Sequence, residues 1–222
     1  MRLHRIKVLV GDKVLVKLME WSDPAKNPLA AVIKTIGPKG LHDVEMQAIV
    51  LESGFETDFP GAVLEEAEKV KKEAGIDATE IARRRDFRDT LTCTIDPAHA
   101  KDFDDALSFK ELHDGRYEVA VHIADVSHYM HDDSLLDREA LTRGTSIYLV
   151  DRTIPMLPEV LSNDLCSLNP GEDKLTFSAV FTLDKNARVV ERWFGKTVIR
   201  SHKRFTYEEA QGLLDEPAHA DV

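Results

Sequence analysis

The stretch that decides the fold is TLTCTIDPAHAKDFDDALSFKEL, residues 90–112. Its first part, TLTCTID, is rich in β-branched side chains and predicts a strand that ends at Asp96, because Pro97 cannot continue a strand ladder. Its last part, DALSFKEL, predicts a second strand. The residues between the two strands carry further acids, so the sequence predicts two strands joined by an acidic loop.

Asp96, Asp102, Asp104 and Asp105 place four carboxylates within ten residues. Like charges this close raise each other's pKa and titrate as a coupled group. A hard divalent cation relieves the repulsion, and Mg²⁺ takes a few carboxylates while it keeps water and phosphate oxygens as its other ligands. The spacing therefore predicts a metal site suited to phosphodiester chemistry.

Two other interpretations of the acidic run are a solvated surface turn and a calcium loop. A solvated turn is less consistent with Phe103 and Ala106, which alternate with the acids as if the loop packed into a core. A calcium loop requires D-x-D-x-D-G spacing with Glu at the twelfth position, and that pattern is absent from the run.

The residues that follow predict an α+β domain with mostly antiparallel strands. Strands are expected at 117–126, after a His113-Asp114-Gly115 turn, and at 175–184 and 189–204, with Lys185-Asn186 between these last two. A helix is expected over 134–144 and should end at Gly144. Thr206 and Glu209 have capping-box spacing and predict the start of another helix.

The residues that precede the acidic run predict a small β-barrel followed by helices. The runs 13–21 and 28–37 alternate apolar and polar residues, and a turn built on Asp23-Pro24 and Asn27-Pro28 joins them. Helices are expected from Val44 to Ser53 and from Pro60-Gly61 to about Ala74. These helices read as a connector between two domains.

The composition is acidic overall, but the acid is unevenly placed. The chain has 222 residues and a formal net charge of −11. Residues 1–60 hold eight basic and eight acidic residues, whereas residues 101–222 hold 14 basic and 23 acidic ones. A nucleic-acid partner usually requires a basic face. The acidic excess lies in the half that contains the carboxylate run.

No targeting or membrane segment is recognisable in the sequence. No stretch reaches the ~18 apolar residues of a membrane helix, and MRLHRIKV has no apolar signal core after it. Cys93 and Cys166 lack C-x-x-C spacing, which argues against a zinc site or a disulfide framework. We expect a soluble, cytoplasmic monomer without membrane contact, with both cysteines reduced and buried.

Three weaker candidates each have a structural alternative. His122 and His128 flank Ile-Ala-Asp and are expected to be core or supporting histidines, because two further zinc ligands cannot be placed. A basic stretch could track phosphates or form a solvated strand face: Arg188, Arg192, Lys196, Arg200, Lys203 and Arg204. Four lysines with one tryptophan could bind single strands, or the tryptophan could be core: Lys7, Lys13, Lys17, Lys34 and Trp21.

At the acidic run the chain resembles the catalytic domain of the ribonuclease II and ribonuclease R family, whose signature is an Asp followed by D-x-D-D. Further runs carry the same resemblance, which is greatest to ribonuclease R: RRDFRD (84–89), HIADVSHY (122–129), IYLVDRTIPMLPEVLSNDLCSLNPGE (147–172) and VIRSHKRFTYEEAQ (198–211). The resemblance implies a partial cold-shock, OB-like barrel in residues 1–60, a helical connector in 61–85 and the first part of the catalytic domain in 86–222.

The resemblance implies processive hydrolysis of RNA from the 3′ end, with release of nucleoside 5′-monophosphates and two-metal catalysis by Mg²⁺ or by Mn²⁺ in its place. Asp96 and Asp105 match the acids that hold the principal metal, Asp104 matches the acid most critical for catalysis, and Asp102 completes the metal-binding set. Tyr148 matches the aromatic residue that stacks on the 3′-terminal base. Without the resemblance, Tyr148 would read as a half-buried core residue.

The resemblance also implies what the 222 residues leave out. The basic residues that clamp the scissile phosphate, the first cold-shock barrel and a C-terminal S1-type barrel all lie outside them. We therefore expect the chain by itself to be inactive. Two alternatives remain, a catalytically silent RNA-binding protein of the same fold and a DNA nuclease, since contacts to the 2′-hydroxyl decide between RNA and DNA.

Overall fold

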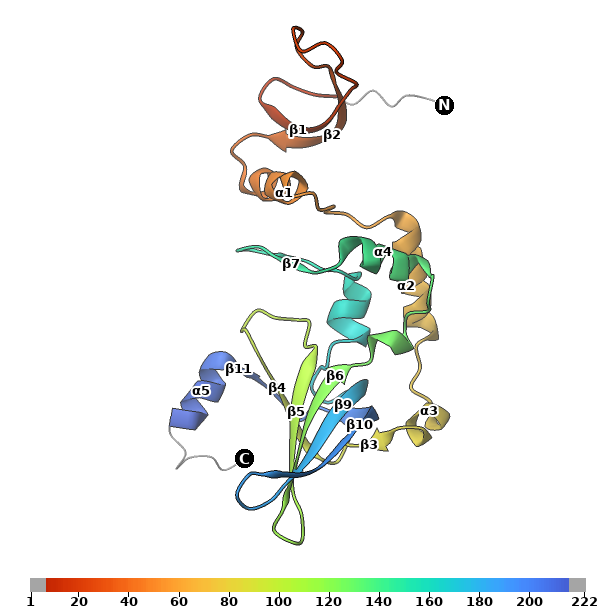
Figure 1. Cartoon of the computed structure of the whole chain (residues 1–222), viewed down its shortest axis with the longest axis vertical. Coiled ribbons are helices and arrows are strands. Elements are labelled where there is room, and N and C mark those ends of the chain that lie inside the picture. The colour runs from red at the N-terminus through yellow and green to blue at the C-terminus, as the bar shows by residue number, and fades with distance from the viewer. Residues whose placement is uncertain (1–6, 216–222) are drawn as a thin grey trace. The chain divides into compact units, whose positions relative to one another are not determined.

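A computed structural model describes residues 7–215 of the chain (Figure 1). Its contacts divide the chain into two compact units. The N-terminal unit holds the residues up to Pro60 together with Thr145–Ile154, and the C-terminal unit holds Gly61–Gly144 and the residues from Pro155 onward. Within the described residues, no helix is long and apolar enough to cross a membrane.

The N-terminal unit is built on an antiparallel strand pair and one helix. β1 (Asp12–Leu18) pairs with β2 (Ala30–Pro38), and α1 (His42–Glu52) follows. Gly37, at φ 142°, lies so close to α1 that an added Cβ would be 2.9 Å from Cγ2 of Val44. A side chain at this position would push α1 away from the strands.

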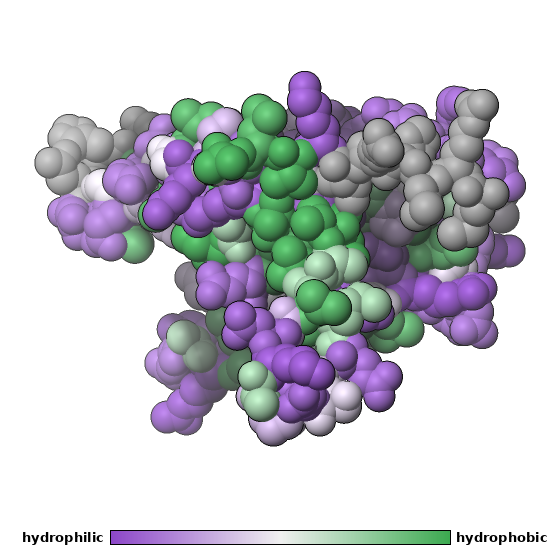
Figure 2. Space-filling model, turned by 90° about the horizontal axis from the view of Figure 1, so that it is seen from above, coloured by the Kyte–Doolittle hydropathy of each residue, from purple (hydrophilic) through white to green (hydrophobic). Residues whose placement is uncertain are grey.

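The loop between β1 and β2 exposes hydrophobic side chains. Leu18 at the end of β1 and Met19, Trp21 and Leu29 of the loop are all more than half exposed. Figure 2 shows that hydrophobic surface gathers on the face of the molecule seen from above. The indole Nε1 of Trp21 donates a hydrogen bond to the carbonyl of Lys26 at 2.7 Å. The core interpretation of Trp21 is therefore wrong, and a role in contacting single strands stays a prediction.

The same unit contains a short hairpin from a distant part of the sequence. β7 (Ile147–Tyr148) pairs antiparallel with β8 (Thr153–Ile154). Arg152 binds Asp43 at the start of α1, and Asp151 lies 2.9 Å from Nε2 of His42. These contacts tie the hairpin to α1, whereas the predicted ranges placed it with the 86–222 segment.

Three helices of the C-terminal unit lie where the sequence predicts them, at 61–73, 135–143 and 207–215, and the other helical segments were not predicted. The elements are α2 (Gly61–Glu73), α3 (Ala78–Ala82), η1 (Val126–His128), α4 (Leu135–Arg143), a π-helical turn η2 (Leu161–Leu165) and α5 (Tyr207–Asp215). The Ser134 side chain caps α4 by accepting from the Asp137 amide, and Gly144 ends it at φ 71°. The predicted capping box is present too, because Thr206 and Glu209 exchange hydrogen bonds of 2.7 and 3.1 Å.

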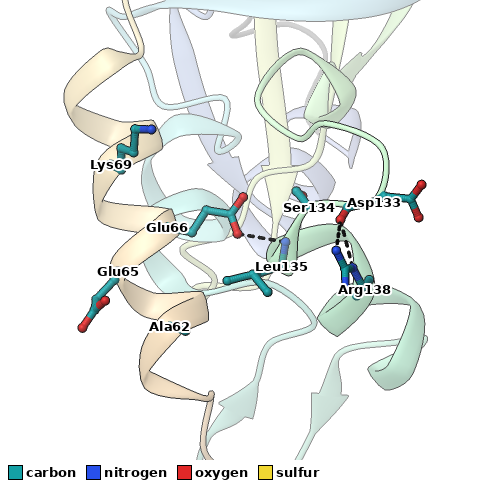
Figure 3. Close-up of a pocket in the computed structure, with 8 residues that line it drawn as sticks. All are labelled: Ala62, Glu65, Glu66, Lys69, Asp133, Ser134, Leu135 and Arg138. Carbon is teal, nitrogen blue, oxygen red and sulfur yellow. Dashed lines mark hydrogen bonds between the residues drawn. The ribbon is translucent and has the colours of Figure 1, made fainter.

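A shallow pocket of about 540 Å³ lies between α2 and α4 (Figure 3). The Glu66 carboxylate accepts from the backbone amides of Leu135 and Leu136 at 2.9 and 3.3 Å. It therefore satisfies amides at the N-terminus of α4, the position that an anionic ligand would otherwise favour. None of the lining residues belongs to the acidic run. The pocket lies where α2 packs against α4 and the residues that precede it.

The described strands of the C-terminal unit form a seven-stranded mixed sheet in the order β11-β4-β5-β6-β9-β10-β3. The pairs β11/β4 and β10/β3 are parallel and the other neighbours are antiparallel. The strand bounds are β3 (Arg85–Asp86), β4 (Leu91–Asp96), β5 (Asp105–Glu111), β6 (Tyr117–Ala124), β9 (Asp173–Leu183), β10 (Val189–Arg200) and β11 (Lys203–Thr206). The predicted mostly antiparallel α+β fold is confirmed.

The prediction of one strand over residues 189–204 is wrong. β10 ends at Arg200, and β11 begins at Lys203 on the far side of the sheet order. Five strand spacings in a flat sheet would span about 24 Å, whereas the links from Arg200 to Lys203 reach at most about 11 Å. The sheet must therefore curl. In the link between β10 and β11, the His202 amide donates a hydrogen bond to the Thr92 carbonyl of β4 at 2.8 Å.

The buried face of the curled sheet mixes polar side chains with small apolar ones. His122 is 0% exposed, with Nδ1 2.6 Å from the Ser178 hydroxyl and Nε2 2.8 Å from the Ser108 hydroxyl. A neutral imidazole has one donor and one acceptor, and a hydroxyl complements either. The interpretation of His122 as a core histidine is confirmed. The opposite face keeps hydrophobic side chains about half exposed, at Phe109, Ile123 and Phe177.

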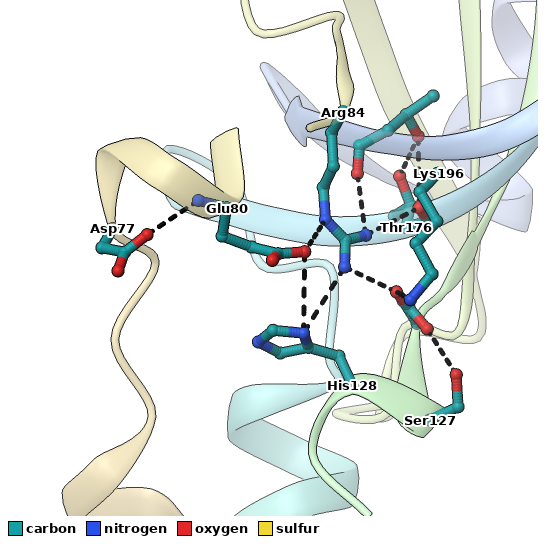
Figure 4. Close-up of polar contacts among 9 residues, drawn as sticks. Asp77, Glu80, Arg84, Ser127, His128, Thr176 and Lys196 are labelled. Carbon is teal, nitrogen blue, oxygen red and sulfur yellow. Dashed lines mark hydrogen bonds and ion pairs between the residues drawn. The ribbon is translucent and has the colours of Figure 1, made fainter. Parts of the chain in front are cut away.

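A buried arginine fastens α3 to the sheet (Figure 4). The side chain of Arg84 is 0% exposed and lies 2.7 Å from both Glu80 and Asp125. Its Nη1 also donates to the carbonyls of Thr176 and Thr197. Both carboxylates and both strands are thereby held by one guanidinium, which suits its planar array of donors.

Candidate active site

The acid loop, defined as residues 96–105, connects the last residue of β4 to the first residue of β5. The two strands pair only from Leu91–Cys93, so they diverge before the loop begins. The far end of β4 instead pairs with β11, where Thr206 lies opposite Asp96. Each strand end is therefore held by a different neighbour, and the loop occupies the opening between them.

Phe103 anchors the middle of the acid loop. Its side chain is 6% exposed, and Ala106 just after the loop is 1% exposed, so the predicted packing of both residues into the core is confirmed. The Phe103 amide donates to the Ser167 hydroxyl at 3.1 Å, and its carbonyl accepts from the Leu168 amide at 2.8 Å. Phe103 therefore anchors the acid loop to the core, which disfavours the interpretation of the loop as a fully solvated turn, although Asp104 and Asp105 are exposed.

The acids of the loop differ in exposure. Asp96 is 7% exposed, Asp102 is half-buried, and Asp104 and Asp105 are exposed. The Oδ2 atom of Asp96 is buried and has no hydrogen-bond partner among the described residues. An unpartnered buried carboxylate oxygen is unfavourable in a protein interior. Asp96 is therefore the acid whose surroundings most require a cation or a further donor.

Burial and neighbouring charge act together on two of these acids. Burial raises the pKa of Asp96, and the nearby Thr94 side chain lowers it. The charges of Asp105 and Asp104 raise it, while the charge of Arg204 lowers it. Burial also raises the pKa of Asp105, with Asp104 adding to the effect. The carboxylates thus lie close enough to disfavour one another's ionised forms, as the sequence predicts.

The donor chemistry of the loop fits a hard divalent cation. Carboxylate oxygens are the preferred ligands of Mg²⁺ and Mn²⁺, and Asp96 offers an oxygen that no described residue uses. Within residues 7–215, however, no group of three or more acids, histidines or cysteines is gathered closely enough to hold an ion. The metal-binding set of Asp96, Asp102, Asp104 and Asp105 therefore stays a prediction.

The structure divides the predicted basic stretch into residues with different partners. Lys196 lies 3.3 Å from Asp125, and Arg200 lies 2.7 Å from Asp173. Arg204 donates to backbone carbonyls of the acid loop. The stretch is therefore not one continuous face, and sequence spacing missed the contact of Arg204 because it depends on the pairing of β11 with β4.

Tyr148 lies at the end of β7, in the N-terminal unit. Its side chain is 70% exposed, so the interpretation as a half-buried core residue is wrong. The hairpin that carries it is closed by the Leu149 amide, which donates to the Arg152 carbonyl at 2.8 Å. An exposed phenol ring on an anchored hairpin can stack on a planar base, and that role stays a prediction.

The remaining candidates have structural roles. His128 is about a quarter exposed and lies near Glu80 and Arg84. Both cysteines are free. Cys166 is buried, but Cys93 is half-buried, so the expectation that both are buried is wrong for Cys93. Burial raises the pKa of Cys166 to about 12. A thiol that stays protonated is a poor nucleophile and metal ligand.

Known protein families match both parts of the sequence. Residues 84–221 match the RNB domain, and residues 4–60 match the cold shock domain. The RNB match includes the whole acid loop. The resemblance stated from the sequence motifs is therefore confirmed.

Known relatives extend well beyond this chain. Ribonuclease R of Thermotoga maritima is 40% identical over 210 residues, which cover 94% of this chain and 29% of that protein. Inactive exonuclease DIS3L2 of Arabidopsis thaliana is 37% identical, covering 93% of this chain and 20% of that protein. The structure of Mycoplasma genitalium RNase R in complex with double-stranded RNA matches with a TM-score of 0.84 and 29% identity, covering 96% of this chain and 37% of that one.

The two relatives matched by sequence are similar across both domains, and the chain spans less than a third of each. The acid loop lies near the start of the segment that matches the RNB domain. The chain belongs to the RNB family of exoribonucleases, with a cold shock domain in front of an RNB domain.

Proposed function

We propose that the protein contributes to processive hydrolysis of RNA from the 3′ end, with release of nucleoside 5′-monophosphates in a Mg²⁺-dependent reaction. The observation that carries the proposal is Asp96. It ends a core strand, it is 7% exposed, and its Oδ2 has no partner among the described residues. Two further acids of the same loop raise its pKa. A divalent cation bound at Asp96 would supply a partner for that oxygen and would lessen the repulsion from the two neighbouring acids.

In this proposal the acids act through charge and position. Asp96 and Asp105 would hold the principal cation, Asp104 is the acid on which hydrolysis depends most, and Asp102 completes the set. A pair of bound divalent cations supplies activation of the attacking water and stabilisation of the leaving oxygen. The chain's part is to fix the carboxylates at the divergent ends of β4 and β5. No side-chain nucleophile is needed.

RNA is the proposed substrate because the matched structure is that of a ribonuclease R bound to RNA. Tyr148 would stack on the base at the 3′ end, and its 70% exposure supports this role. Stacking is worth roughly 1 to 3 kcal/mol per base and tolerates any sequence, because every base has a π-face. The proposed enzyme would therefore degrade RNA without base preference.

A second candidate function is RNA binding without catalysis. It is favoured by one relative whose name calls it inactive. Against it, this sequence retains all four acids of the loop. Clustered carboxylates beside a phosphate backbone would oppose binding unless cations lie between them.

The two functions are distinguished by a chimera in which this chain replaces the matching segment of Thermotoga maritima ribonuclease R. The substrates are oligoribonucleotides labelled at the 5′ or the 3′ end, with Mg²⁺ or with a chelator. With Mg²⁺ only, we expect full-length 5′-labelled RNA to be converted to a short end product with few intermediates, and the 3′ label to be released at once as a mononucleotide. Tight binding without degradation would favour the second candidate, and internal cleavage would contradict exonucleolytic action.

A further inference from the structure

Arg204 on β11 contacts the acid loop directly. Its Nη2 donates to the carbonyls of Pro97 at 2.7 Å and of Ala98 at 2.8 Å. Its guanidinium lies 5.1 Å from the ring centroid of Phe103, in the arrangement of a cation–π contact. One side chain therefore touches the beginning of the loop, just after Asp96, and the middle of the loop at Phe103.

The sheet topology explains why Arg204 reaches this place. β11 runs parallel to β4, with Arg204 opposite Thr94 and Thr206 opposite Asp96. Side chains alternate along a strand, so the neighbouring Lys203 has other contacts and lies 4.4 Å from the ring centroid of Phe205. Among the contacts that the structure describes, those of Arg204 include the acid loop and those of the adjacent Lys203 do not.

The loop contacts of Arg204 add to others that fix its path. The Ala100 amide donates to the Pro97 carbonyl at 2.9 Å, so this carbonyl accepts from both Ala100 and Arg204. On the other side, Ser167 accepts from the Phe103 amide and donates to the Lys101 carbonyl at 2.7 Å. Arg204 holds the start of the loop, and Ser167 holds its middle.

We propose that Arg204 is a positioning residue that fixes the acid loop so that its carboxylates can share a divalent cation. The inference rests on the proposed function. Arginine suits the task because its planar guanidinium can donate to two carbonyls while it stacks on a ring. Lysine keeps the charge but offers neither the fixed donor geometry nor the flat surface.

The sign of the effect separates positioning from simple electrostatics. A positive charge near a cation site repels the cation, so its removal should tighten cation binding if charge alone matters. If Arg204 positions the loop, its removal should weaken cation binding instead. Loss of a supporting partner behind metal ligands typically weakens metal affinity by roughly 10- to 100-fold.

The experiment compares the 222-residue chain with Arg204→Gln and with the matched control Lys203→Gln, which removes the same charge from the neighbouring position. Mn²⁺ binding is measured by electron paramagnetic resonance, and amide hydrogen exchange at Ala100 and Phe103 is measured by NMR without added metal. We expect Arg204→Gln to weaken Mn²⁺ binding at least about tenfold and to speed exchange at both amides. Lys203→Gln should do neither.

Each alternative result has a defined meaning. Mn²⁺ binding that is unchanged or tighter in Arg204→Gln, or equally weakened in Lys203→Gln, would overturn the inference while the proposed function stands. An unsubstituted chain that binds no Mn²⁺ contradicts the proposed function itself, and the inference falls with it. If Arg204→Gln does not fold, the same measurements on Arg204→Lys decide, since full retention of affinity and exchange protection would show that geometry is irrelevant.

Discussion

The Nη2 atom of Arg84 lies 2.7 Å from Oδ2 of Asp125, and the two side chains are 0% and 3% exposed. Asp125 belongs to the HIADVSHY run, and Arg84 is the first residue matched by the RNB domain. The pair therefore joins the beginning of the domain to the end of β6. Its burial makes it the ion pair whose disruption should affect folding most.

We predict that Arg84→Met lowers the free energy of unfolding by about 3–5 kcal/mol, because it leaves the Asp125 charge buried with a weaker partner. Urea denaturation monitored by circular dichroism measures the loss. Lys196→Met is the control, since Lys196 is half exposed and lies 3.3 Å from the same carboxylate. Its effect should stay below about 1 kcal/mol. Equal effects of the two substitutions would show that the buried pair is not special.

His122 predicts a pH dependence of stability. Burial lowers its pKa to about 4, whereas an unfolded histidine titrates near pH 6.5. Between pH 4 and pH 6.5 the unfolded state therefore binds more protons than the folded state. The contribution of His122 to the free energy of unfolding is fully present above pH 6.5 and is lost as the pH falls toward 4. The full loss attributable to His122 is about 3 kcal/mol.

The measurement for His122 is the urea midpoint of the chain at pH 7 and pH 5, compared with His122→Asn. Asparagine can still donate to one serine and accept from the other, but it does not titrate. The substituted chain should lose less stability between the two pH values than the original. If the urea midpoint changes by the same amount between pH 7 and pH 5 in both chains, the prediction is contradicted.

Asp104→Asn should reduce RNA hydrolysis by the chimera at least about a hundredfold, the range expected when a group that stabilises the transition state is removed. RNA binding should be nearly unchanged because Asp104 is exposed and no binding contact is assigned to it. Asp114→Asn, in the exposed turn between β5 and β6, is the control for loss of one negative charge. Undiminished turnover of the Asp104→Asn chimera would show that the acid loop is not the active site.

Tyr148→Ala should weaken binding of an RNA 3′ end by roughly 1 to 3 kcal/mol and change the length of the shortest product. Because the side chain is 70% exposed, we expect the free energy of unfolding to change little. Val150→Ala, on the same hairpin and 92% exposed, is the control. Fluorescence anisotropy and product sizing test the first claim. Unchanged products with a loss of several kcal/mol in stability would show a structural role instead.

We also predict that the 222-residue chain alone binds Mg²⁺ or Mn²⁺ only weakly, on the order of millimolar, as expected of sites with few protein ligands and many waters. It should degrade RNA slowly or not at all. The reason is that the chain covers only 29% of the length of the ribonuclease R relative. Rapid, metal-dependent degradation of single-stranded RNA by the chain would refute this.

Features that depend on neighbouring residues could be predicted from the sequence. Asp96 lies at a strand end because a β-branched run meets Pro97, and α4 ends at Gly144 because glycine accepts a left-handed backbone. The capping box at Thr206 likewise needs only four residues. The acid motif is recognisable for the same reason, since its carboxylates lie close together in the sequence.

Features that depend on strand pairing could not be predicted in this way. The stretch 189–204 has one continuous β pattern, yet β10 and β11 lie at separate places in the sheet because the sheet curls. Alternation along β6 shows that the side chains of His122 and Ile123 lie on opposite faces of the sheet, but it does not show which of the two faces is buried. The contact of Arg204 with the acid loop also follows from the pairing of β11 with β4. Periodicity reports which residues share a face, while long-range hydrogen bonding and packing select the partner of each face.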